Sequence, residues 1–148
     1  MSDSTPPVVL SKLDYESLAD FRYRLRRFLR FSEELIQTHG ITPLQYLLLL
    51  QIKGYPGREW ATVAELAERL QAHHHGVVAL ISRCEKAELV KRRPGRDDKR
   101  CVEVILQAKG EELVAQLAAL HRDRVTELKR VMAGLFTHLP SDSDFLAG

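Results

Sequence analysis

The sequence predicts a mainly α-helical fold with a small β-wing, of the winged helix-turn-helix class. Two short segments, 62–70 and 74–87, carry apolar side chains at helical spacing and are separated by a tight break. A basic segment, LVKRRPGRDDKRCVEVIL, follows them. Its apolar and polar residues are arranged as in two strands joined by a turn. Long amphipathic stretches lie near both ends of the chain, and we expect them to be dimerisation helices.

The first long helix is expected from about Asp14 to Gly40, where glycine suits a left-handed helix end. At 1.5 Å per residue this is about 35 Å of helix, too long for a small domain alone to cover. Thr42-Pro43-Leu44-Gln45 is a capping box with proline at the first helical position. The nearly all-apolar helix that follows should run through the core and stop at Gly54.

A short extended segment near Trp60 should lead into a second capping box, Thr62-Val63-Ala64-Glu65. In the next helix, from His74 to Ala87, the predicted inward side chains are Val77, Leu80, Ile81 and Cys84. Strands are expected at 89–93 and 101–106, with the turn at 94–99. Leucines near a seven-residue spacing predict a last long helix at 108–136, ended by Pro140.

These elements suggest four parts within one intertwined domain. Residues 1–12 form a flexible leader, 13–54 the N-terminal dimerisation and core helices, 55–107 the winged lobe, and 108–148 the C-terminal dimerisation helix and tail. The lobe is too small to cover both apolar stripes of the long helices. We therefore expect a homodimer.

Composition narrows the class of protein. The 148 residues include no apolar run near the ~20 residues of a membrane span, and the start lacks the features of a signal peptide. We therefore expect a cytoplasmic protein. No phosphate-binding loop, nucleophile elbow, metalloprotease motif or paired-cysteine site occurs, so we expect no enzyme and no cofactor. Cys84 and Cys101 are expected to be small buried residues.

The net charge of +2 hides a strong segregation. Residues 83–100 hold eight Lys or Arg against four acids, and residues 22–30 hold five arginines and no acid. The remaining chain is acidic. A cationic face of this kind suits the phosphates of duplex DNA, whereas a charged edge hairpin that only resists aggregation would not need such an excess of cations.

The second short helix is expected to enter the major groove, with apolar Val78 and Ala79 against thymine methyls. A hairpin arginine would enter the minor groove, held by Asp98. The alternative is a solvated surface. The candidate DNA-binding residues are Thr62, His74, His75, Val78, Ala79, Ser82, Arg83, Arg96, Asp98, Lys99 and Arg100.

Two other clusters have several interpretations. Consecutive helical residues point about 100° apart, so His73, His74 and His75 cannot converge on one metal ion, and we expect no metal site there. A metal-responsive regulator, and a winged-helix module that binds protein, stay as alternatives. The arginines of residues 22–30 could be solvated, pair with a partner helix, contact phosphate, or line a pocket for an anionic ligand; Arg22, Arg26 and Tyr46 are the candidate ligand-binding residues.

From about Phe21 to Phe136 the chain resembles the MarR (multiple antibiotic resistance regulator) family. The resemblance rests on TVAELAERL from Thr62, LVKRRP from Leu89, the wing motif Asp-Lys-Arg at 98–100, and LQAKG from Leu106. It implies a homodimer that represses transcription at a pseudo-palindromic operator until a small aromatic or anionic effector binds. Four departures bear on it: His73 replaces the usual Ser or Thr cap, Ala79 an arginine, Glu88 a glycine, and Gln107 the usual Thr cap.

Overall fold

The computed structural model describes residues 6–136. The chain divides into two compact units, which are described separately. The arm comprises the described parts of 1–30 and 123–148, and the lobe comprises residues 31–122. Helix α1 (Lys12–Thr38) and helix α5 (Ala108–Ala133) each contribute to both units.

Helix α1 begins two residues before the predicted start, because Ser11 and Asp14 cap it reciprocally. The backbone N–H of Ser11 donates to Asp14 Oδ2 at 2.7 Å, and the N–H of Asp14 donates to Ser11 Oγ at 3.3 Å. This pair meets the orphan amides of the first turn. Residues 6–10 precede the helix without regular structure, and residues 1–5 lie outside the described part of the chain.

Helix α2 (Pro43–Lys53) is the core helix of the lobe, as predicted. Thr42 and Gln45 form both hydrogen bonds of the expected capping box. Leu48, Leu49 and Ile52 are fully buried, and the helix packs against α3, α4, β1 and β3. The lobe of residues 31–122 therefore includes α2 as well as the predicted winged lobe of residues 55–107.

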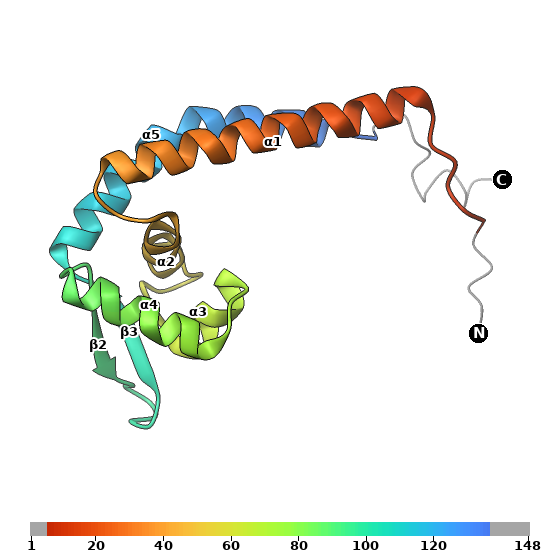
Figure 1. Ribbon diagram of the computed structural model, residues 1–148. Coiled ribbons are helices and arrows are strands. Elements are labelled where there is room, and N and C mark those ends of the chain that lie inside the picture. The colour runs from red at the N-terminus through yellow and green to blue at the C-terminus, as the bar shows by residue number, and fades with distance from the viewer. Residues whose placement is uncertain (1–5, 137–148) are drawn as a thin grey trace. The chain divides into compact units, whose positions relative to one another are not determined.

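A three-stranded antiparallel sheet completes the lobe. Strand β3 (Val102–Leu106) lies between β1 (Trp60–Thr62) and β2 (Val90–Pro94). Arg92 is paired with Val104 and Arg93 with Glu103. The hairpin of β2 and β3 extends from the lobe beside α4 (Figure 1). Both predicted strands and their turn are confirmed, with bounds shifted by a residue.

Helices α3 (Val63–Leu70) and α4 (His74–Lys86) form the predicted helix-turn-helix. The break between them falls at Gln71, whose φ of 51° is left-handed. The N–H groups of Gln71 and Ala72 donate to carbonyls of the last turn of α3, Glu68 and Ala67. Helix α5 ends at Ala133, three residues before the predicted end, and Pro140 lies outside the described residues.

The residue that follows the C-cap of α4 is a glutamate with a strained backbone conformation. Glu88 has a φ of 63°, a region that glycine adopts at no steric cost. The N–H of Leu89 donates to Cys84 O at 2.9 Å, and the N–H of Glu88 donates to Glu85 O at 3.0 Å. These are the two hydrogen bonds of a Schellman helix end, which favours glycine at this position.

We expect Glu88→Gly to raise the free energy of unfolding by about 1 kcal/mol, because it removes the left-handed strain. Urea denaturation of both proteins at pH 7 measures this difference. Glu88→Ala is the matched control, since it removes the same side chain but keeps a Cβ at positive φ. Equal stabilisation by both substitutions would contradict the strain account.

Candidate nucleic-acid interface

Helix α4 presents a nearly uncharged face over its first two turns. His74, His75, Val78 and Ala79 are exposed, and Val78 keeps 36% of its accessible surface. The opposite side chains, Val77, Leu80, Ile81 and Cys84, are buried in the core as predicted. The structure therefore places these four candidates together on one surface of α4, and Ser82 is exposed as well. Arg83 is also exposed, in the last turn of α4.

The N-terminus of α4 lacks a side-chain cap. His73 occupies the cap position, and its side chain makes no capping hydrogen bond. This agrees with histidine's being a poorer cap than serine or threonine. The first-turn amides of α4 therefore have no acceptor from the cap residue.

Ser82 is engaged within the protein. Its hydroxyl donates to Val78 O at 3.0 Å and accepts from Arg92 Nη2 at 2.8 Å. Arg92 Nη2 also donates to Val78 O at 3.1 Å, and Arg92 Nη1 donates to Glu85 Oε1 at 3.2 Å. Arg92 thus connects strand β2 to the outer face of α4, a role that the sequence pattern did not assign to it.

The hairpin tip is closed by backbone hydrogen bonds. Gly95 N–H donates to Cys101 O at 2.8 Å, and Cys101 N–H donates to Asp98 O at 3.0 Å. A Cβ on Gly95 would collide with the Asp98 carbonyl oxygen, so only glycine fits there without a backbone shift. The tip is therefore a defined turn that fixes where residues 96–100 lie.

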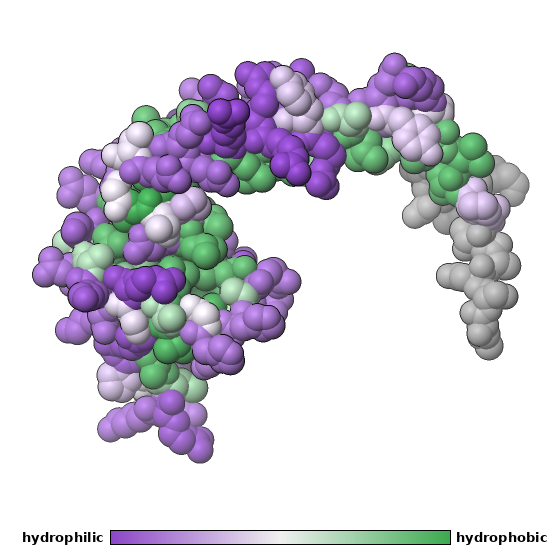
Figure 2. Space-filling view, in the orientation of Figure 1, coloured by the Kyte–Doolittle hydropathy of each residue, from purple (hydrophilic) through white to green (hydrophobic). Residues whose placement is uncertain are grey.

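Asp98 and Arg100 form the expected pair at this tip. Arg100 Nε donates to Asp98 Oδ1 at 3.1 Å, and Arg100 N–H donates to the same oxygen at 3.0 Å. These hydrogen bonds lower the pKa of Asp98. The Arg100 side chain is 92% exposed, and Arg96 and Lys99 are also exposed. Hydrophilic side chains cover the tip (Figure 2).

Arg93 is held by a buried acid. Its Nε donates to Glu103 Oε1 at 2.9 Å, and Glu103 Oε2 accepts from Arg96 N–H at 3.2 Å. Burial by itself would raise the pKa of Glu103, but the hydrogen bonds from Arg93 and Arg96 N–H lower it overall. Arg92 and Arg93 are therefore both largely buried ion-pair partners of acids in the lobe, whereas the Arg100 side chain stays exposed in its pair with Asp98.

Thr62 acts as the N-cap of α3. Its hydroxyl accepts from Glu65 N–H at 3.2 Å, and Thr62 N–H donates to Glu65 Oε1 at 2.9 Å. Glu65 Oε2 also accepts from Tyr55 and Arg58. Burial opposes the charge of Glu65, but these hydrogen bonds outweigh it and lower the pKa to about 2. The Arg58 guanidinium carbon lies 3.8 Å from the Trp60 ring centroid and 4.2 Å from that of Tyr55.

The two thiols differ. Cys84 is buried as predicted, and burial raises its pKa to about 11. The prediction that Cys101 is buried was wrong, because it lies exposed in the hairpin turn, directly before β3. Within residues 6–136, no three His, Cys, Asp or Glu side chains are placed to hold a metal ion. No helix of the described residues is long and apolar enough to cross a membrane.

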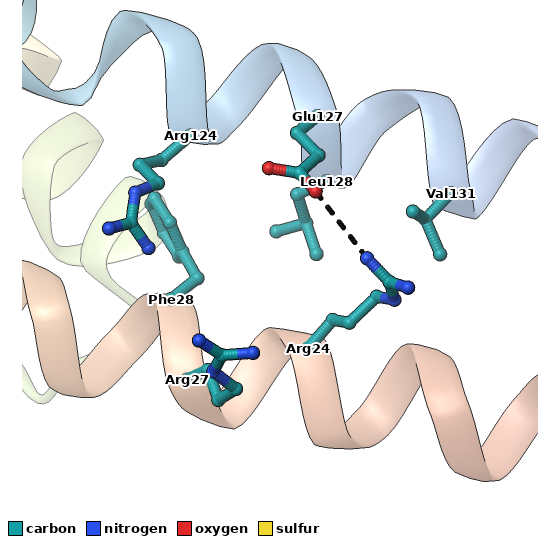
Figure 3. A pocket seen from close by; sticks show the side chains of 7 residues that line it. All are labelled: Arg24, Arg27, Phe28, Arg124, Glu127, Leu128 and Val131. Atoms are coloured by element: carbon teal, nitrogen blue, oxygen red, sulfur yellow. Dashed lines mark hydrogen bonds and ion pairs between the residues drawn. The ribbon is translucent and has the colours of Figure 1, made fainter.

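The arm contains a pocket of about 110 Å³ between α1 and α5 (Figure 3). Arg24, Arg27 and Arg124 lie on its walls with Phe28, Glu127, Leu128 and Val131. Arg24 Nη1 is 3.4 Å from Glu127 Oε1. The arginines of α1 that line the pocket are therefore sequence neighbours of Arg22 and Arg26, the predicted ligand-binding residues. Arg22 and Arg26 themselves are exposed on α1.

The third candidate ligand residue, Tyr46, lies in the lobe. It is buried there, and its ring stacks on His121 with centroids 5.1 Å apart. His121 Nε2 lies 2.7 Å from Ser32 Oγ, and its Nδ1 lies 2.6 Å from Leu117 O. Tyr46 is therefore part of the packed interior of the lobe.

Known protein families and solved structures were compared with this chain and its fold. The model of the MarR family matches residues 39–100. The fold is similar to AbsC, a MarR family transcriptional regulator from Streptomyces coelicolor, with 21% identity, a TM-score of 0.66, and 95% of this chain and 89% of AbsC covered. No curated protein sequence matches the chain.

Two further solved structures have the same fold. A mutant of MarR from E. coli in complex with operator DNA is 22% identical, with a TM-score of 0.61 and 84% and 82% of the two chains covered. MepR, a transcription regulator of the Staphylococcus aureus multidrug efflux pump MepA, is 17% identical, with a TM-score of 0.64 and 85% of each chain covered.

Proposed function

We propose that this chain, which has the MarR-type winged-helix fold and matches that family's model over residues 39–100, is a sequence-specific DNA-binding transcriptional regulator. One observation carries the proposal. The exposed, nearly uncharged face of α4 lies in the same lobe as a hairpin whose tip exposes Arg96, Lys99 and Arg100. Such a lobe offers a helix for base edges and cations for phosphate.

In this proposal α4 reads sequence in the major groove. Val78 and Ala79 offer apolar contact to thymine methyls, while His74 and His75 offer ring nitrogens to base edges or phosphates. Arg83, exposed in the last turn of α4, contacts the DNA backbone. Thr62 contributes by capping α3, because its hydroxyl already accepts the Glu65 N–H.

The wing supplies most of the electrostatic attraction. Arg100 is held by Asp98 yet is 92% exposed, so its charge is available to the minor groove while its direction is restrained. The negative potential of a narrow minor groove favours an inserted arginine. Arg96 and Lys99 reach the neighbouring phosphates.

We propose further that the protein acts as a homodimer on a pseudo-palindromic operator. The arm exposes large apolar side chains that a second copy would cover, at 46–60% of their accessible surface: Leu13, Tyr15, Tyr23, Val125 and Met132. A two-fold dimer would place two α4 helices in half-sites about 34 Å apart. Sedimentation at micromolar concentration measures the oligomeric state.

The regulatory effect that fits best is repression relieved by a small aromatic or anionic effector. The arm pocket supports an anionic ligand, since three arginines accompany one glutamate beside Phe28 and Leu128. Arg22 and Arg26 would add to the local positive potential from the surface of α1. Benzoate is a simple probe. Release of bound DNA by benzoate, lost in Arg27→Ala, would support an effector site at this pocket.

The direct test of the proposed function is selection of bound genomic fragments, followed by equilibrium titration of a selected fragment. Binding through several phosphates should weaken by orders of magnitude between about 50 and 200 mM salt. A shuffled duplex of the same length should bind far more weakly. Failure to bind any duplex would favour a winged-helix module that binds protein.

A further inference from the structure

Arg92 joins two elements that the proposed function uses separately. It lies in the middle of β2, and its guanidinium reaches Val78 O, Ser82 Oγ and Glu85 Oε1 on α4. Its backbone N–H adds a fourth hydrogen bond, to Glu85 Oε2 at 2.9 Å. Hydrogen bonds that involve a charged partner are the stronger ones in proteins.

The same contacts change the expected role of Ser82. Its hydroxyl proton is donated to Val78 O, and one of its lone pairs accepts from Arg92. A serine that contacts a base edge would have to give up at least one of these partners. In the described structure Ser82 is therefore part of the connection between helix and hairpin.

Arg92 also differs electrostatically from the cations at the tip. Glu85 pairs with it at 3.2 Å, and the Arg92 side chain is only 27% exposed. Lys91, the preceding residue on β2, is exposed, and alternation along a strand directs it to the opposite face. The chain thus offers two adjacent cations of which only one is bound to α4.

We propose that Arg92 is a positioning residue that fixes the wing, the hairpin of β2 and β3, against α4. We propose also that Ser82 belongs to this connection and does not contact a base. The inference rests on the proposed DNA-binding function. With the connection intact, α4 and the hairpin tip present their contacts in one fixed relative geometry. Without it, each still binds DNA, but the two no longer fit the groove together.

The test compares Arg92→Gln with the matched control Lys91→Gln, because each removes one positive charge at neighbouring positions. Affinity is titrated at several salt concentrations on a selected duplex and on a shuffled duplex. We expect Arg92→Gln to weaken the selected duplex by roughly tenfold or more, equivalent to about 1.4 kcal/mol, with the shuffled duplex little affected and the salt dependence unchanged. Lys91→Gln should change both duplexes by the same factor.

Two results would overturn the inference. Equal loss on both duplexes, with a salt slope smaller by about one, would make Arg92 a direct phosphate contact. Unchanged affinity would leave it without a role. If the wild-type protein bound neither duplex, the proposed function itself would have failed. Both results above differ from this one, because in them the wild-type protein still binds the selected duplex.

Ser82→Ala provides an independent test that keeps the Arg92–Glu85 pair and so does not depend on the stability of the Arg92 variant. We expect the base preferences of Ser82→Ala, measured by selection from a random duplex library, to equal those of wild type. A changed preference confined to one base pair of each half-site would show that Ser82 reads a base and would overturn its assignment.

Discussion

Glu65→Gln is expected to lower the free energy of unfolding by about 3 kcal/mol at pH 7. The pKa of Glu65 falls from its ordinary 4.5 to about 2 in the folded protein, and each pKa unit corresponds to about 1.4 kcal/mol. The causes are the hydrogen bonds from Tyr55, Thr62 and Arg58, which outweigh the opposing effect of burial. Glutamine can still cap α3 but cannot neutralise Arg58.

The effect should depend on pH in a defined direction. A carboxylate whose pKa is depressed in the folded state stabilises the protein fully above its unfolded pKa. This stabilisation is lost as the pH falls from about 4.5 through about 2. The stability difference between wild type and Glu65→Gln should therefore be about 2 kcal/mol smaller at pH 3 than at pH 7.

Urea denaturation of both proteins at pH 7 and pH 3 measures this. Glu112→Gln is the control, because Glu112 is exposed on α5 in the same lobe and should have little effect on stability at either pH. An equal deficit of Glu65→Gln at pH 3 and pH 7 would show that the charge of Glu65 contributes nothing.

Arg100→Ala is expected to weaken binding of a selected duplex by about 1–3 kcal/mol, or roughly fivefold to 150-fold. The Arg100 side chain is 92% exposed and its guanidinium donates two hydrogen bonds to Asp98, which also accepts from the Arg100 backbone N–H. Its contact with DNA should therefore require little further ordering of the side chain. Titration at one fixed salt concentration measures the loss.

Arg24→Ala is the matched control, because it removes an arginine of the arm, which lies outside the lobe. It should leave the affinity for duplex nearly unchanged. Asp98→Ala should give part of the Arg100 loss, because it removes the restraint and not the cation. Unaltered affinity of Arg100→Ala would exclude the wing from the interface.

Much of the fold could be predicted because its signals are local. The capping boxes at Thr42 and Thr62 place helix starts whatever the rest of the chain does, and both are present. The inward face of α4 follows from helical spacing, and Val77, Leu80, Ile81 and Cys84 are buried accordingly. Helix α1 starts earlier than its apolar spacing indicates, because the start depends on the Ser11–Asp14 capping hydrogen bonds.

The sequence could predict a residue of the candidate site only where its role follows from its position and exposure on a single helix or turn. The roles of Arg92, Arg93 and Glu103 depend on contacts between elements, which spacing along the chain does not encode. Alternation along β3 would place the acid at position 103 on a solvent-exposed face, so the burial of Glu103 could not be predicted from the pattern. The exposure of Cys101 likewise depends on how the hairpin turn closes.

The account's central claim is a division of labour within the lobe, in which α4 selects sequence and the wing supplies affinity. Selection from a random duplex library with wild type, His75→Ala, Val78→Ala and Arg100→Ala tests it most directly. We predict that the helix variants change which bases are preferred, and that Arg100→Ala keeps the wild-type major-groove preferences at lower affinity. Unchanged preferences in both helix variants, with altered ones in Arg100→Ala, would contradict it.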